Sequence, residues 1–427
     1  MSADERPLAI GDVLAATEAA SPLEAVTAVT GELGVALGAT KASFLIADLS
    51  GRALVRLAHV DLDADAGLTG AGVGDERRSG QESATVLPFD GGPQEQAVRT
   101  QEVQVVSDAG SWTVLAPVTE RGEAIGLLEV TLTAPPTPAC LVTVARLAHL
   151  LAFVVIANRR HTDLYEWGQR TRPLSLSAEI QHRLLPGPQT CEAGAFTLAG
   201  WLEPAAGIAG DTFDFSLGRD LLHLSLTDAM GHGVAAALTA TLCVGSLRNA
   251  RQEGVSLLEQ VAAANRALVD HAAASSLEDF VTGLVARVDL RTGSMAVVNA
   301  GHIAPYLARG PRGAPLDLHV DLPLGLFGDA TYRTSRLDLE PGDRVVLVTD
   351  GMLERTAVLV DLPAAIAETR SLHPREAVRA LADRVLAATG DALSDDATVL
   401  CLDWHGGHGR ARDTSHGAEQ ERASERG

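Results

Sequence analysis

Short turns between successive strand-like segments are the feature that most restricts the fold of the second half of this chain. Three such segments, residues 280–290, 295–299 and 305–308, follow one another, and Arg291-Thr292-Gly293 separates the first two. A tight turn reverses the chain, whereas parallel neighbours need a long crossover, so these strands should pair in antiparallel order. Two helix-like segments, residues 233–251 and 255–273, precede them. We therefore predict an α+β fold of stacked antiparallel β-sheets flanked by helices, and not a doubly wound parallel sheet.

Composition and charge exclude several classes of protein. The chain has 427 residues, which is enough for two or three domains. Its net charge of −21 argues against the basic surface that nucleic-acid binding requires. The four cysteines lie far apart, so we expect reduced thiols rather than a disulfide or zinc framework. The N-terminus is unlike a signal peptide, and the most apolar stretch, residues 141–157, contains Arg146 and His149. We therefore expect a cytoplasmic protein that binds neither nucleic acid nor membrane.

The first 137 residues have the element order of a sensor domain. A helix near residues 21–37 precedes strand-like segments at 42–46, 53–58, 103–106, 113–118 and 124–132, and residues 61–90 read as loop. This order resembles a GAF-type domain, and its last two strands look like the closing hairpin of that family. We predict an α/β GAF-like sensor domain at residues 1–137. The alternative is an interaction domain that binds no small molecule.

Residues 138–189 read as a helical connector that Pro173 interrupts. Leu176, Ile180 and Leu184 share one helical face. We interpret the connector as a signalling helix or the seam of a homodimer; the alternative is a helix packed on its own domain. The α+β domain would then occupy residues 190–404, and residues 405–427, which lack periodic apolar positions, should form a disordered tail.

Four acidic sites in the second half share a local design, because each lies at a strand edge or in a turn beside small residues. They are Asp211, Asp228, Asp350 and the pair Asp395-Asp396. Gathered carboxylates repel one another and have raised pKa values without cations. Oxygen ligands with no neighbouring cysteine favour Mg²⁺ or Mn²⁺, and two such ions about 3.5–4 Å apart can bridge a water and hold phosphate oxygens. Each Asp alone is usually a turn residue, so the ordered set carries the prediction.

The set and its surroundings resemble the PPM-type (type 2C) protein serine/threonine phosphatases, in the bacterial branch of the stage II sporulation protein E and of the phosphatases that regulate stress sigma factors. The resemblance runs from Ile180 to Leu402 and rests on seven stretches, residues 180–186, 203–211, 228–233, 299–302, 324–326, 341–351 and 395–398.

The resemblance implies a role for each matching residue. Four carboxylates would hold two divalent ions, Mn²⁺ or Mg²⁺: Asp211, Asp228, which bridges both, Asp350 and Asp395. Ala229 would contribute its backbone carbonyl, and Asp396 replaces Asp395 if the register is displaced by one residue. All four main carboxylates are present, so we predict an active enzyme.

The sequence departs from the family pattern before the first Asp. Ala209 replaces one of two glycines, and residues 205–208 lack the Arg that holds phosphate in eukaryotic members. The phosphate-binding group beyond the metal ions is left open. Backbone N–H groups of residues 231–233, at the start of a helix, are one option.

Further polar residues near the motifs have two readings each. His232 could be a general acid or a turn residue, whereas we expect His302 to have a packing or hydrogen-bonding role. Asp214 and Glu354 could orient the metal ligands or be solvated at the surface.

The resulting hypothesis is hydrolysis of phosphoserine or phosphothreonine on a protein by direct attack of water, without a covalent enzyme intermediate. In this branch the usual substrate is a phosphorylated anti-anti-sigma factor, and the first domain would regulate the second. One alternative is a sensor or scaffold whose phosphatase domain is weak or held inactive. A metal-dependent nuclease also uses clustered Asp, but the acidic charge argues against it.

Overall fold

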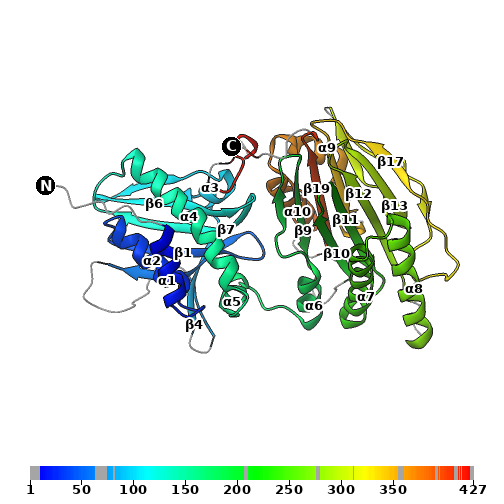
Figure 1. Cartoon of the computed structure of the whole chain (residues 1–427), viewed down its shortest axis with the longest axis horizontal. Coiled ribbons are helices and arrows are strands. Elements are labelled where there is room, and N and C mark those ends of the chain that lie inside the picture. Colours follow the sequence, from blue (N-terminus) through cyan, green and yellow to red (C-terminus); the bar gives the residue numbers. More distant parts are fainter. Residues whose placement is uncertain are drawn as a thin grey trace. The chain divides into compact units, whose positions relative to one another are not determined.

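The computed structural model describes residues 10–62, 75–79, 82–205, 210–275, 279–310, 312–353, 360–389, 393, 395–407, 412, 414 and 416–423. The chain divides into two compact units (Figure 1). Unit 1 contains Met1–Pro173 and Asp413–Gly427, and unit 2 contains Leu174–Arg412. Each unit has its own hydrophobic core.

Unit 1 is built on one antiparallel sheet of seven strands in the order β3-β4-β2-β1-β7-β6-β5. The strands are β1 (Lys41–Ala47), β2 (Ala53–Asp61), β3 (Asp75–Ser79), β4 (Glu82–Pro88), β5 (Gln104–Asp108), β6 (Ser111–Glu120) and β7 (Glu123–Leu132). The helices are α1 (Ile10–Ala19), α2 (Ala25–Ala36), α3 (Pro93–Thr100), α4 (Pro138–Asn158) and α5 (Leu164–Gln169). Its GAF-like character stays a prediction.

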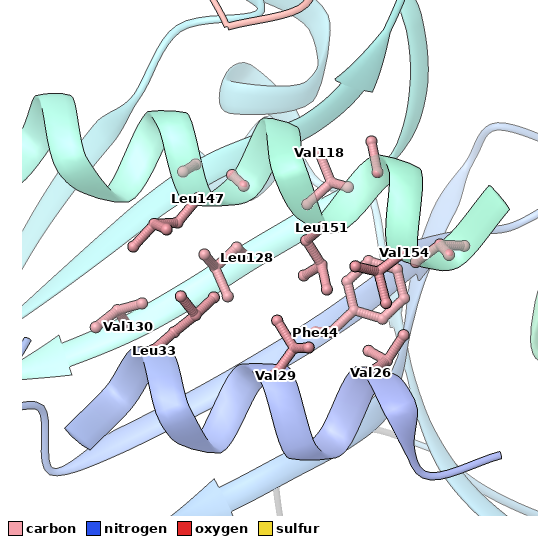
Figure 2. Packing of buried hydrophobic residues seen from close by; sticks show 14 of the residues in the cluster. Val26, Val29, Leu33, Phe44, Val118, Leu128, Val130, Leu147, Leu151 and Val154 are labelled. Carbon is pink, nitrogen blue, oxygen red and sulfur yellow. The ribbon is translucent and has the colours of Figure 1, made fainter. Parts of the chain in front are cut away.

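The core of unit 1 lies between the sheet and two helices. Figure 2 shows α2 and α4 side by side, with side chains from both directed at the same face of the sheet. Val29 and Leu33 of α2 and Leu151 of α4 meet Phe44 of β1 and Leu128 of β7, and all of them are buried. Burying aliphatic side chains of this size contributes roughly 1.5–3 kcal/mol each, so α4 is integral to unit 1.

Two predictions for the first half are wrong. Residues 61–90 are not all loop, because they contain the paired strands β3 and β4. The β3 sequence Asp-Glu-Arg-Arg-Ser has no apolar alternation, since an edge strand needs only backbone pairing on one side. The connector at 138–189 is three separate helices, and the first of them, α4, packs on its own unit.

α4 also passes the length and composition test for a membrane-spanning helix. The same composition is typical of a core helix in a folded protein, and its Val144, Leu147, Leu151 and Val155 are buried against unit 1. The packing therefore accounts for the apolar sequence of this helix.

A short C-terminal segment, residues 416–423, belongs to unit 1. The backbone N–H of Gly122, in the turn between β6 and β7, donates to the carbonyl of Gly417 at 3.1 Å. Ala418 and Glu419 are buried, and Glu419 forms an ion pair of 2.7 Å with Arg422. These residues contradict the prediction of a disordered tail from 405 to 427, which had been based on missing periodicity. A segment this short can be ordered by a few contacts with the rest of its unit, so it needs no helix or strand with a periodic apolar face.

Unit 2 contains two sheets of six strands. One has the order β10-β11-β12-β13-β16, with β17 also on β13, and the other has the order β15-β14-β18-β19-β9-β8. All pairs are antiparallel except β13 with β16. The strands are β8 (Thr190–Glu192), β9 (Phe196–Glu203), β10 (Asp211–Leu217), β11 (Leu221–Ala229), β12 (Val281–Asp289), β13 (Ser294–Ala300), β14 (Tyr306–Arg309), β15 (Arg312–Pro315), β16 (Val320–Asp321), β17 (Ser335–Asp338), β18 (Arg344–Val348) and β19 (Ala397–Trp404).

The two sheets share a core, and helices cover their outer faces (Figure 1). The helices are α6 (Leu176–Leu184), α7 (Gly233–Gln252), α8 (Leu257–Ser275), α9 (Leu362–Glu368) and α10 (Pro374–Thr389), with short 3₁₀ turns η1 (Asp350–Leu353) and η3 (Thr369–Ser371). α7 and α8 pack on the sheet that contains β11 and β12, and α9 and α10 pack on the sheet that contains β18 and β19. The predicted α+β fold of stacked antiparallel sheets flanked by helices is confirmed.

The division into units differs from the predicted domains 1–137, 138–189, 190–404 and 405–427. The boundary after the first unit lies at Pro173, because α4 and α5 pack on unit 1 while α6 packs on α7. The expected dimer face of α6 is also different. Leu176 is exposed, Ile180 is half-buried, and the buried side chains of this helix are the polar residues Ser177 and Gln181.

Candidate metal centre

The hairpin of β10 and β11 brings two of the predicted ligands together. Asp211 is the first residue of β10, and the antiparallel register places it directly opposite Asp228 near the end of β11. Gly210 makes this close approach possible, because a Cβ atom at that position would lie 2.4 Å from the carbonyl oxygen of Ala229. The two carboxylates therefore belong to one end of one sheet.

Two threonines from the other sheet of unit 2 hold the side chain of Asp211. The hydroxyls of Thr349, after β18, and Thr398, in β19, each donate to Oδ2 of Asp211 at 2.6 Å. Asp211 is 2% exposed. Neither hydroxyl contacts Oδ1, so the threonines fix the carboxylate and leave its other oxygen for a further ligand.

The remaining predicted ligands follow strands of the second sheet. Asp350 is exposed and begins η1 directly after β18, and Asp395 precedes β19 and is half-buried. The adjacent Gly351 is required by packing, because a Cβ atom there would lie 2.0 Å from the carbonyl oxygen of Asp396. The backbone around Asp350 is thus held against the backbone around Asp395.

Asp396 differs from its neighbour because protein donors engage both of its oxygens. Oδ1 accepts from the backbone N–H of Ala205 at 2.8 Å, and Oδ2 accepts from the amide of Gln181 at 2.6 Å. The same Gln181 amide donates to the carbonyl of Asp211 at 2.9 Å. Asp396 therefore ties α6 to β10 and β19, whereas Asp395 is the more exposed carboxylate of the pair.

Electrostatic repulsion links the acidic residues into one site. Burial first, and then repulsion from the carboxylates of Asp350, Asp395 and Asp396, together raise the pKa of Asp228 to about 7. Burial also raises the pKa of Asp211 well above its usual range, with added repulsion from Asp228. The repulsive part of these pKa shifts arises only when the carboxylates lie close enough to one another to interact.

The pKa of Asp396 is raised by burial as well, but the hydrogen bonds from Ala205 and Gln181 oppose the rise. Donors that satisfy a carboxylate favour its charged form. The protein thus neutralises part of the charge at Asp396 with its own N–H groups. It supplies no comparable donor set for Asp228 among the hydrogen bonds of the described residues.

The donor set fits divalent cations. Carboxylate oxygens without a thiol or imidazole among them suit Mg²⁺ or Mn²⁺, and the excess negative charge around Asp228 is what such cations neutralise. Among the described residues, no group of three or more Asp, Glu, His or Cys side chains lies close enough together to hold a metal ion. The register, the shared packing and the mutual repulsion are therefore the evidence for the site.

The structure assigns several other polar residues to packing. His302 is buried: its Nε2 lies 3.1 Å from the carbonyl of Val348, its Nδ1 lies 2.7 Å from the hydroxyl of Thr282, and burial lowers its pKa to about 4. The predicted hydrogen-bonding role of His302 agrees with these contacts. His232 is exposed at the start of α7 and caps it without a side-chain hydrogen bond.

Asp214 neither orients a ligand nor faces solvent. It is buried and forms ion pairs of 2.9 Å with Arg248 and 3.0 Å with Arg251, which tie β10 to α7. Glu354 and residues 206–209, including Ala209, lie outside the described residues.

Sequence reasoning gave no role to Thr349, Thr398 or Gln181, although each contacts the site. All three stand inside the quoted motifs. The available signal for the threonines is a hydroxyl residue directly after β18 and another at the second position of β19. The pairing of Asp211 with Asp228 could also have been found by counting. The hairpin register pairs Leu217 with Leu222, and six residues outward from each lie Asp211 and Asp228.

Comparison with known proteins gives matches for the second half of the chain. Residues 218–405 match the family model described as stage II sporulation protein E. The phosphoserine phosphatase RsbU of Bacillus subtilis (strain 168) is 25% identical over 239 residues, which cover 54% of this chain and 69% of RsbU. The phosphoserine phosphatase RsbP of the same organism is 25% identical over 191 residues, 44% of this chain and 46% of RsbP. A solved structure of the RsbU and RsbW domains of Rv1364c from Mycobacterium tuberculosis is 24% identical, with a TM-score of 0.43, over 50% of this chain and 61% of that one.

Proposed function

Because residues 218–405 match the family model of the stage II sporulation protein E, we propose that this chain is a metal-dependent phosphatase that hydrolyses phosphoserine or phosphothreonine on a protein. The observation that carries the proposal is the strand register that places Asp211 directly opposite Asp228, where the carboxylates of Asp350 and Asp395 also repel the charge of Asp228. RsbU and RsbP, to which the chain is similar, are phosphoserine phosphatases.

In the proposed site Asp211, Asp228, Asp350 and Asp395 hold two divalent cations, Mn²⁺ or Mg²⁺, and the carbonyl of Ala229 contributes to the same centre. Bound cations supply a water of lowered pKa and neutralise the phosphate charge. Thr349 and Thr398 fix one oxygen of Asp211, so the carboxylate keeps its orientation when cations bind. Asp396, whose oxygens are both engaged by N–H donors, positions α6 and β10.

The proposed substrate is a phosphorylated anti-anti-sigma factor, the class that the family resemblance implies, and the proposed location is the cytoplasm.

Unit 1 is proposed to regulate unit 2, since it is a separate unit with its own core. Comparing the rate of residues 174–412 with that of the whole chain tests the regulation. Equal rates would refute it.

The activity is tested with the whole chain, first stripped of metal by a chelator and then supplied with Mn²⁺ or Mg²⁺. We expect phosphate release from a serine-phosphorylated protein only after the metal is added. Asp228→Asn should abolish the release, and Asp220→Asn, at the turn end of the same hairpin, is the matched control. Metal-independent hydrolysis, or equal rates for Asp228→Asn and the wild type, would refute the assignment.

A further inference from the structure

The first half of α7 consists of small, apolar and threonine residues, and one of its sides is open to solvent. No charged residue occurs in this helix before Arg248. Ala240, Cys243 and Leu247 pack on α8 and the sheet, but Val234 is 41% exposed and Leu238 is 54% exposed. A helix that is hydrophobic all round is normally buried, and an apolar surface left exposed marks a contact with another molecule.

This open side starts beside the acidic site. Met230, two residues after Asp228, is 44% exposed, and α7 begins at Gly233. Val234 and Leu238 are one helical turn apart, about 6 Å along the axis. The apolar surface therefore extends away from the metal centre along the helix.

A second exposed apolar pair lies on a segment that backbone hydrogen bonds connect, through residues 280–281, to the segment of Met230. The backbone N–H of Met230 donates to the carbonyl of Phe280 at 3.0 Å, and Val281 pairs with Leu324 through bonds of 2.9 and 2.8 Å. These bonds place the segment that begins at Leu324 beside the segment of Met230. Leu326 and Phe327 follow directly and are 42% and 49% exposed. We call these five residues the α7 surface: Met230, Val234, Leu238, Leu326 and Phe327.

We propose that the α7 surface is the docking site for the folded phosphoprotein substrate, an inference that rests on the proposed phosphatase function. A phosphoserine side chain is short, so a phosphate that reaches Asp228 brings the protein carrying it onto the residues around Met230. The chain has a net charge of −21, so at long range it repels the negatively charged phosphate group of the substrate. Apolar contact at the α7 surface supplies the affinity that charge attraction does not.

The test compares two substrates for the whole chain with Mn²⁺. p-Nitrophenyl phosphate reaches the metal centre without a protein surface, whereas a serine-phosphorylated anti-anti-sigma protein has to dock. We expect Leu238→Ser and Phe327→Ser each to lower kcat/KM for the phosphoprotein at least tenfold and to leave turnover of p-nitrophenyl phosphate unchanged. Leu217→Ser is the matched control, because Leu217 is 47% exposed at the end of β10 opposite to Asp211.

Several results would overturn the docking proposal. Equal losses for both substrates, in variants that keep the wild-type circular dichroism spectrum, would mean that these residues support the metal centre and not the docking of the protein. No loss for either substrate would mean that the substrate does not use this surface. A change of oligomeric state in Leu238→Ser, without a change in phosphoprotein turnover, would assign the surface to a second copy of the chain.

A binding measurement separates this proposal from the proposed activity. Binding of the phosphoprotein is measured to Asp228→Asn and to Asp228→Asn combined with Leu238→Ser. At least tenfold weaker binding by the double variant supports docking even if the wild type hydrolyses nothing. Equal binding refutes docking even if the wild type is active.

Discussion

Asparagine in place of Asp228 should stabilise the metal-free chain at alkaline pH, although the variant lacks a proposed ligand. The side chain keeps its shape and loses a charge that burial and the carboxylates of Asp350 and Asp395 disfavour. A pKa difference of one corresponds to about 1.36 kcal/mol. The rise from 3.8 to about 7 therefore means that ionised Asp228 costs the folded state up to about 4 kcal/mol at pH 8.

The sign of the pH dependence follows from the direction of this shift. The folded chain keeps the proton on Asp228 up to about pH 7, whereas the unfolded chain releases it near 3.8. The free energy of unfolding therefore falls as pH rises through this window. At pH 5 the variant should gain less over the wild type, about 2 kcal/mol, because folded Asp228 is then still protonated.

Hydrogen exchange of the amides of β10 and β11, measured in chelator at pH 5 and pH 8, reports the opening of unit 2 itself. The gain of Asp228→Asn should grow with pH, and Mn²⁺ should reverse the order by stabilising the wild type alone. Asp220→Asn should behave as the wild type. If Asp228→Asn is no more stable than the wild type at pH 8 in chelator, the carboxylates do not crowd Asp228 and the reasoning fails.

Three other substitutions test separate contacts. Thr349→Val removes a hydroxyl that supports Asp211 and should raise the Mn²⁺ concentration for half-maximal phosphatase activity roughly tenfold, as expected for one lost charge-assisted hydrogen bond; an unchanged titration would contradict the role. Asp214→Asn breaks two ion pairs between β10 and α7 and should lower the free energy of unfolding by about 3 kcal/mol in thermal denaturation, whereas an unaltered melting temperature would show that the pairs contribute little. Ala418→Asp places a charge at a buried position and should release residues 416–423 to proteolysis; protection equal to that of the wild type would argue against their docking on unit 1.

The antiparallel half of the chain could be predicted because its signals are local. β12 and β13 are apolar runs bounded by a Gly-containing turn, and the two helices before them have no internal breaks. Local patterns fix such elements to within about two residues. The order of the acidic sites was also readable, since each Asp lies at the end of a strand or within two residues of one.

What escaped prediction depends on contacts between distant segments. β3 is polar throughout and exists because β4 pairs with it. The amide of Gln181 is buried between Asp396, 215 residues away, and the backbone of Asp211. No periodicity in α6 indicates that a glutamine faces inward while Leu176 faces solvent. The packing of α4 on unit 1 was likewise hidden, because an apolar helix reads the same in a dimer seam and in a core.

The return of residues 416–423 to unit 1 sets an order of events during synthesis. Unit 1 is interrupted after Pro173 and resumes at Asp413, so the whole of unit 2 emerges from the ribosome in between. At 5–20 residues per second, these intervening residues take roughly 10 to 50 s to make. For that time unit 1 has its sheet and α4 but lacks the segment that covers the turn between β6 and β7. Unit 1 therefore acquires its last contacts only after all of unit 2 has been translated.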